Sequence, residues 1–176
     1  MIKENLVGRA TRVWIVEDEA RVVGVVQEVL RYFGRGASYE GALGERMQEG
    51  DGDFFILSSS DWDRGLALEP NVVFLREVPE GALAEALLRA VADGGIVVYP
   101  EGETELLEEA EGMRFFRREA YPRVALQDGG LAVETDWGHL ALPSGHRAAM
   151  ESFWGVVELC RHLGVMPDEF YEAVLA

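Results

Sequence analysis

The sequence contains a single cysteine, Cys160, and a single lysine, Lys3, among its 176 residues. One cysteine excludes an internal disulfide framework and any zinc site that needs several cysteines. Apart from Lys3, every lysine or arginine position holds arginine, so a mechanism that needs a lysine in the folded core has no candidate. The chain also has no apolar run of the ~20 residues that a membrane span requires and no signal-peptide pattern. We therefore expect a cytoplasmic protein.

Positive charge is scarce, and the formal net charge is -16. A protein this acidic repels nucleic acid and anionic membrane surfaces, so neither is expected as a partner. Hydrophobic residues make up 48% of the chain, which is enough for one well-buried core. Since no repeat, low-complexity tract or linker interrupts the sequence, we predict a single domain over residues 1–176.

Apolar runs and helical patterns alternate along the first two thirds of the chain. The apolar runs are short and continuous, as in the strands of a parallel sheet. Asp18 is predicted to cap the first helix, and Gly34 to end it. The predicted strands are 11–16, 54–57, 72–75 and 96–99, and the predicted helices are 18–33, 80–92 and 104–111.

The pattern changes after residue 112. Short alternating segments separated by Gly129-Gly130 and by Asp136-Trp137-Gly138 predict antiparallel hairpins over 113–142. Two helices are predicted to follow, over 147–163 and from Pro167 onward. The expected fold class is therefore a three-layer α/β fold with a mainly parallel sheet and a small antiparallel addition.

Three stretches carry a resemblance to a known family. GDFFILSSSDWDRGLALEPNVVFL (52–75) resembles the stretch of Mur ligases in which a strand enters a Glu-Ala-Asp-Glu-type motif. GGIVVYPEG (94–102) is similar to a later strand of that family, and LALPSGHRAAM (140–150) to its Pro-Gly-x-His-Asn helix. The resemblance covers residues 11–176. It implies the P-loop-type central ATP-binding domain without the family's UDP-binding and amino-acid-binding domains.

The residues that bind ATP and magnesium in that family are different here. Where the family has a glycine- and lysine-containing P-loop, this chain reads VEDEARV, with Glu17, Asp18 and Glu19. Each carboxylate would repel a phosphate by about 4 kcal/mol at ~4 Å and an effective dielectric constant near 20. Ser58 occupies the position where that family has its magnesium-binding glutamate. The resemblance thus implies a vestigial nucleotide site in which no cofactor, and in particular no ATP, is expected.

The last motif is also altered. His146 and the glycine before it match the family, whereas Arg147 and Met150 replace its two asparagines. The family's carbamylated lysine has no counterpart. These substitutions imply that no catalytic residue remains.

Simpler interpretations exist for the acidic residues. Glu17, Asp18 and Glu19 can cap a helix and complement its dipole rather than bind a cation. Asp18 and Asp61 could meet across neighbouring strand ends as a magnesium site, but solvation of both at the surface is the favoured interpretation. The three histidines share no metal-ligand spacing, so no metal site is predicted.

The preferred hypothesis is a stand-alone pseudoenzyme that acts through protein interaction, with a link to peptidoglycan synthesis in the cell wall. Phe170 and Val174 continue an apolar stripe on the last helix, and Trp62 lies in a polar run. We expect these three residues to contact a protein partner or a second copy of the chain. The negative charge favours a basic partner.

Two alternatives stay open. An ATP-dependent ligase could use Arg64, Arg76 and Arg147 in place of the missing lysine, because guanidinium groups bind phosphate. The segment WIVEDEARVVGVVQEVLRYFG (14–34) also resembles the start of a response-regulator receiver domain. The second alternative is therefore a receiver-like signalling module that is not phosphorylated and that would end near residue 110.

Overall fold

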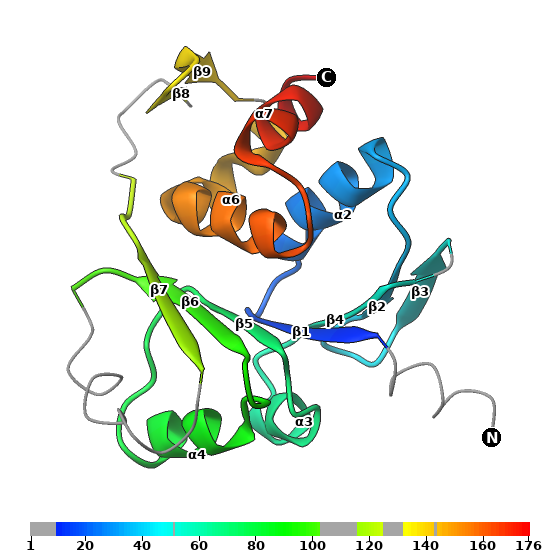
Figure 1. The fold of residues 1–176 in the computed structure, drawn as a ribbon, viewed down its shortest axis with the longest axis vertical. Helices are drawn as coiled ribbons and strands as arrows, with labels where there is room; N and C mark the ends of the chain where they lie inside the picture. Colours follow the sequence, from blue (N-terminus) through cyan, green and yellow to red (C-terminus); the bar gives the residue numbers. More distant parts are fainter. Residues whose placement is uncertain (1–9, 51, 103–115, 125–131, 143) are drawn as a thin grey trace.

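The chain folds into three layers, with a seven-stranded sheet between two layers of helices (Figure 1). This computed structural model describes residues 10–50, 52–102, 116–124, 132–142 and 144–176. One face of the sheet is covered by α2 (Val22–Tyr32), α6 (Phe153–His162) and α7 (Pro167–Leu175). The other face carries α3 (Trp62–Ala67) and α4 (Ala82–Ala90). The predicted fold class is confirmed.

The sheet has the strand order β3-β2-β4-β1-β5-β6-β7. Every neighbouring pair is parallel except β2 and β3, which form an antiparallel hairpin. The sequence analysis did not predict this hairpin. The strands are β1 (Thr11–Val16), β2 (Ala37–Glu40), β3 (Arg46–Glu49), β4 (Phe54–Ser58), β5 (Val72–Leu75), β6 (Ile96–Pro100) and β7 (Arg117–Tyr121).

The strand order rules out the receiver interpretation. In a flavodoxin-like receiver the first strand lies between the second and the third, in the order 2-1-3-4-5. Here β4, the third parallel strand along the chain, lies between β2 and β1. In addition, β7 pairs with β6, and α6 packs on β5, β6 and β7, so these two elements from the chain after residue 112 belong to the same fold.

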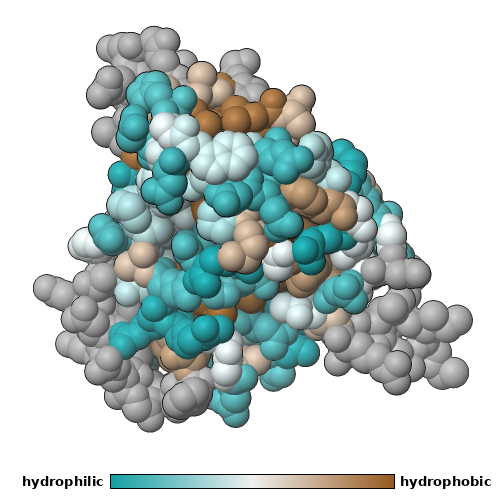
Figure 2. Space-filling view, turned by 45° about the horizontal axis from the view of Figure 1, so that its top comes forward, coloured by the Kyte–Doolittle hydropathy of each residue, from teal (hydrophilic) through white to brown (hydrophobic). Residues whose placement is uncertain are grey.

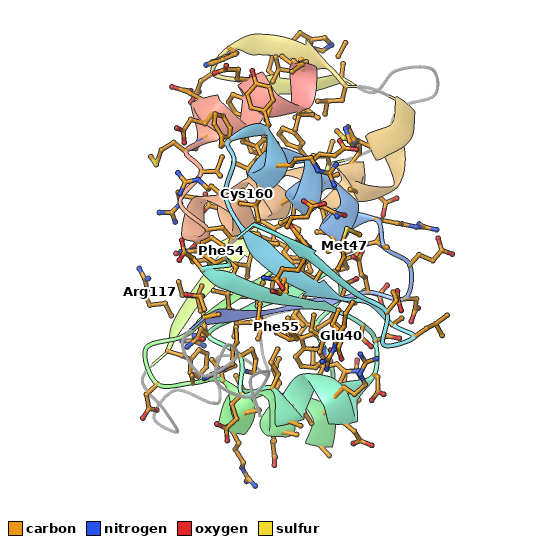
Figure 3. All side chains as sticks on the ribbon, turned by 90° about the vertical axis from the view of Figure 1, so that its right-hand side faces the viewer. Glu40, Met47, Phe54, Phe55, Arg117 and Cys160 are labelled. Atoms are coloured by element: carbon orange, nitrogen blue, oxygen red, sulfur yellow. The ribbon has the colours of Figure 1, made fainter. Side chains whose placement is uncertain are left out.

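Neighbouring residues of the central strands face opposite helical layers. On β4, Phe54 packs with the α2, α6 and α7 side while Phe55 packs with the α3 and α4 side (Figure 3). On β1, Val13 and Ile15 face the first layer and Trp14 faces the second. Both faces are buried, which explains why these strands are continuous apolar runs.

The prediction of antiparallel structure over 113–142 is partly wrong. β7 runs parallel to β6. β7 is polar at Arg117, Arg118 and Glu119 because it is an edge strand, and α6 packs on it. The hairpin prediction is confirmed for β8 (Ala132–Thr135) and β9 (Gly138–Ala141), which pair antiparallel. Gly138 has φ +88° in the turn, a conformation that favours glycine.

The helix boundaries differ from the prediction in two places. The expected helix over 147–163 is divided into a 3-10 segment, η1 (Ser144–Ser152), and α6. The first helix begins at Val22 rather than at Asp18. Its predicted stop is confirmed, since Gly34 has φ +63°. The helix expected over 104–111 lies outside the described residues.

The apolar stripe on α7 is buried, so the predicted surface role of Phe170 and Val174 is wrong. Phe170 is 1% exposed and Val174 7% exposed. Phe170 meets Phe153 of α6 edge-to-face at 5.8 Å, and α7 also packs along α2. Large apolar side chains that are exposed near α7 are Trp137, Met166 and Leu175.

The face seen in Figure 2 is largely hydrophilic, with small separate hydrophobic areas. No helix among the described residues is long and apolar enough to cross a membrane.

Candidate functional site

The candidate site is a cavity of 390 Å³ at the carboxyl ends of β1, β4 and β5. The loop after β1 leads to α2 on one face, and the loops after β4 and β5 lead to α3 and α4 on the other. Ligands of doubly wound sheets bind at such a switch point. The lining residues are Val16, Glu17, Asp18, Ser60, Trp62, Arg76, Glu77, Val78, Pro79, Leu83, Arg123, Glu151 and Ser152.

Glu17 lines the cavity just before the start of α2. Its carboxylate accepts hydrogen bonds from the backbone N–H groups of Arg21 (3.2 Å), Val22 (2.9 Å) and Val23 (3.0 Å). Ser58, at the end of β4, donates its hydroxyl to the same carboxylate at 2.9 Å. The residue is only 4% exposed. Glu17 therefore supplies the capping interaction that the sequence analysis assigned to Asp18, which is exposed.

The Glu17 carboxylate therefore occupies the place at the N-terminus of α2 where an anion such as phosphate could bind. The first N–H groups of a helix have no partner within the helix, and together with the helix dipole they attract anions. At α2 these N–H groups already donate to Glu17. A phosphate at the same place would have to displace the Glu17 carboxylate.

Two arginines line the opposite side of the cavity. Arg76 follows β5, and its buried Nε has no hydrogen-bond partner among the described residues. Its backbone carbonyl accepts a hydrogen bond from Arg123 Nη2 at 3.0 Å, which holds the Arg123 guanidinium beside the Arg76 backbone. An unpaired buried donor is costly, so Arg76 is the group in this cavity with the most to gain from an acceptor.

Trp62 gives the cavity an aromatic wall. It is the first residue of α3, is half-buried, and meets Trp14 edge-to-face at 5.0 Å. Val78, Pro79 and Leu83 add apolar lining beside it. A few polar groups set in an apolar wall are typical of a small-molecule or side-chain binding pocket.

Asp61, His146 and Glu19, which were also predicted as site residues, are not among the described residues that line the cavity. Asp61 accepts a hydrogen bond from the Arg64 N–H at 3.2 Å and so caps α3. His146 lies in η1 and pairs with Glu28 of α2 at 3.1 Å. Glu19 pairs with Arg21 at the surface. Arg147 is part of η1, and its side chain lies outside what the structure describes.

Arg64 is used to hold the β2–β3 hairpin. Its guanidinium donates to the carbonyls of Ala42 (2.7 Å) and Gly41 (3.0 Å) and pairs with Glu40 at 2.7 Å. Partial burial alone would raise the pKa of Glu40, but its hydrogen bonds with Arg64 and Arg46 lower that pKa overall. Arg64 therefore does not line the cavity, whereas Arg76 does.

Sequence reasoning missed part of the cavity. Arg123, Glu151 and Ser152 come from the chain after β7 and from η1, far from β1 in the sequence. No local pattern marks them, because the packing of η1 against α2 and α6 brings them to this edge of the sheet.

No protein-family model matches the chain, and no curated protein matches it significantly. Solved structures do match. One is the UDP-N-acetylmuramate:L-alanyl-gamma-D-glutamyl-meso-diaminopimelate ligase (MPL) from Neisseria meningitides, with a TM-score of 0.65 and 16% identity. That match covers 98% of this chain and 68% of the other.

Two further ligases give similar matches. The murein peptide ligase Mpl from Psychrobacter arcticus has a TM-score of 0.65 and 9% identity, over 99% of this chain and 48% of that one. The UDP-N-acetylmuramoylalanyl-D-glutamyl-2,6-diaminopimelate–D-alanyl-D-alanyl ligase from Acinetobacter baumannii has a TM-score of 0.63 and 11% identity, over 98% and 47%. The chain thus spans about half the length of these two ligases. At such identities the likeness shows the fold alone, and this chain has a Mur-ligase-like α/β fold.

Proposed function

We propose that this chain is a Mur-ligase-like domain that has lost MgATP chemistry and acts by binding another protein. The observation that carries the proposal is the Glu17 carboxylate, which accepts three N–H groups at the start of α2 and the Ser58 hydroxyl. These donors are the ones that a phosphate would need.

Electrostatics support the same conclusion. A phosphate oxygen brought to ~4 Å from Glu17 would be repelled by about 4 kcal/mol at an effective dielectric constant of 20. Asp18, Glu77 and Glu151 add carboxylates to the cavity lining. Arg76 and Arg123 offset only part of this charge, and the chain has no lysine to add except Lys3.

The cavity mouth suits a basic protein partner. Asp18, Glu77 and Glu151 line the cavity together with Trp62 and Leu83. A lysine or arginine side chain entering there would meet negative charge and an aromatic ring, which attracts cations. We propose that such a partner is cytoplasmic and serves peptidoglycan synthesis, because the ligases of the same fold act on UDP-N-acetylmuramate compounds.

Calorimetric titration of the chain with MgATP tests the proposal. We expect no binding, and a dissociation constant below ~0.1 mM, worth about 5.5 kcal/mol, would overturn it. Glu17→Ala provides the complementary test, because it frees the N–H groups of Val22 and Val23. Inorganic phosphate should then raise the unfolding temperature of Glu17→Ala and leave that of the parent unchanged. Equal effects on both proteins would contradict the assigned role of Glu17.

The partner is tested by affinity capture from the native cell with Trp62→Ala as the matched control. Trp62 lies at the start of a short helix and is half-buried, so circular dichroism must first show that the variant is folded. We expect the parent to retain a basic protein and the variant to lose it. Retention of the same proteins by both would refute a role for the cavity mouth.

A second candidate function rests on Arg76. Arg76 lines the cavity, and its guanidinium is the kind of group that an ATP-dependent ligase with relocated phosphate ligands would need. In that case the parent hydrolyses or binds a nucleotide, and Arg76→Gln abolishes it while Arg64→Gln, outside the cavity, does not. The absence of nucleotide turnover and binding in the parent would eliminate this candidate.

A further inference from the structure

A second cluster of polar side chains joins the edge strand β7 to helix α6, on residues that the candidate site does not use. Glu119 lies in the middle of β7, and Glu158 and His162 lie one helical turn apart on α6. One ligand atom from each of the three lies within 4.8 Å of the other two. His162 Nε2 is 2.8 Å from Glu119 Oε2, and its side chain is only 8% exposed.

The two carboxylates in this cluster need a cation between them. In the structure Arg161 fills that role, with Nη2 at 2.8 Å from Glu158 and 3.2 Å from Glu119. Burial raises the pKa of Glu119, but hydrogen bonding and charge interactions with His162 and Arg161 lower it overall.

The resident guanidinium can be displaced. Its side chain is 39% exposed, in contrast to the imidazole of His162. Glu119, Glu158 and Arg161 also line a cavity of 420 Å³ that is separate from the candidate site. Arg161 can therefore turn into solvent and leave an open space, with room for water, beside the carboxylates of Glu119 and Glu158. His162 does not line this cavity but lies 2.8 Å from the Glu119 carboxylate.

We propose that Glu119, Glu158 and His162 form a binding site for a divalent metal ion of the zinc class, which replaces Arg161 as the counter-cation of the two carboxylates. One imidazole and two carboxylates suit Zn²⁺ or a similar transition metal. Mg²⁺ prefers oxygen ligands alone in an octahedral arrangement, so it should bind far more weakly. The bound ion would tie the sheet edge at β7 to α6.

The test is calorimetric titration of the untagged full chain with ZnCl₂ after removal of metals with a chelator. We expect one site per chain for Zn²⁺ and no comparable heat with MgCl₂. His162→Gln and Glu158→Gln should each weaken binding at least tenfold. Arg161→Ala should strengthen it several-fold, because the competing cation is gone. His139→Gln is the matched control, since His139 also pairs with a glutamate, Glu134, but on the exposed β8–β9 hairpin.

Several results would overturn the proposal. Equal Zn²⁺ affinities of His162→Gln, His139→Gln and the parent would show adventitious binding. A loss of stability in Arg161→Ala with unchanged Zn²⁺ affinity would show an ion-pair network and no metal site. If His162→Gln does not fold, the absorption spectrum of the Co²⁺-loaded parent decides. A thiolate charge-transfer band would assign the ion to Cys160 and refute the site, and a spectrum of nitrogen and oxygen ligands that Glu158→Gln abolishes would support it.

Discussion

Replacing Glu17 by alanine removes the side chain that caps α2 and joins it to β4. The N–H groups of Val22 and Val23 lose a buried acceptor, and Ser58 loses the group to which it donates. Loss of a helix cap costs ~2 kcal/mol at the upper end of its range, and loss of one further buried hydrogen bond costs ~1 kcal/mol. We therefore expect the free energy of unfolding to fall by about 3 kcal/mol.

The expected change is large enough to measure by urea denaturation followed by tryptophan fluorescence. For a chain of this size, ~3 kcal/mol corresponds to a fall of roughly 6–12 °C in Tm. Because the change removes a local interaction, the urea m-value should stay the same. Ser58→Ala should lower the free energy of unfolding by about 1 kcal/mol, since it removes one hydrogen bond.

Glu19→Ala is the matched control. Glu19 is two residues away and carries the same charge, but it is exposed and pairs with Arg21 at the surface. Its removal should change the free energy of unfolding by no more than about 0.5 kcal/mol. If Glu17→Ala is no more destabilising than Glu19→Ala, the cap has been assigned to the wrong carboxylate. The inference that Glu17 occupies the anion position would then fail with it.

Three further predictions concern single side chains in the core. Tyr39→Phe should leave the free energy of unfolding unchanged or raise it by about 1 kcal/mol in urea denaturation, because the buried Tyr39 hydroxyl has no hydrogen-bond partner in the part of the chain that the structure describes. A clear loss of stability would show that the hydroxyl has a partner. Gly65→Ala should lower the Tm, because a Cβ there would lie 2.1 Å from the Trp14 ring. Gly24→Ala is the control and should raise the Tm slightly, because Gly24 lies in α2 with open space around it. Cys160 should react with a thiol reagent only in denaturant, because burial raises the pKa of its thiol; rapid reaction of the native protein would contradict its burial.

Much of the fold could be predicted from the sequence because both faces of the central sheet are buried. The continuous apolar runs that became β1, β4, β5 and β6 are a consequence of that burial, and they were predicted to within a residue or two. β2, β3 and β7 carry polar residues because they lie toward the sheet edges. From their sequence patterns, β2 and β3 were not predicted as strands, and the region of β7 was predicted to be antiparallel although β7 runs parallel to β6.

The candidate site was predictable in composition but not in geometry. The acidic run after β1 indicated a turn unsuited to phosphate, and the capping interpretation named the right kind of interaction. The cluster on β7 and α6 had one local signal, the four-residue spacing of Glu158 and His162. Its third member, Glu119, is 39 or more residues away and could not be assigned from that spacing.

The alternation of apolar strand and helix patterns is enough to predict the layers of this protein, because it shows which segments must be buried. The sequence also determined the chemistry available after β1, where no glycine or lysine is present to hold a phosphate. Which carboxylate turns inward depends instead on contacts between distant segments. Glu17 does so because Ser58, from a strand more than 40 positions along the chain, donates to it beside the N-terminus of α2. The burial of Phe170 and Val174 likewise depends on distant segments, because α7 packs against both α2 and α6. The hydrogen bond from Tyr32 at the end of α2 to Glu172 of α7, at 3.0 Å, joins two of these helices. A stripe on one helix shows that it needs a partner, and contacts between distant segments determine whether that partner is the rest of the chain or another molecule.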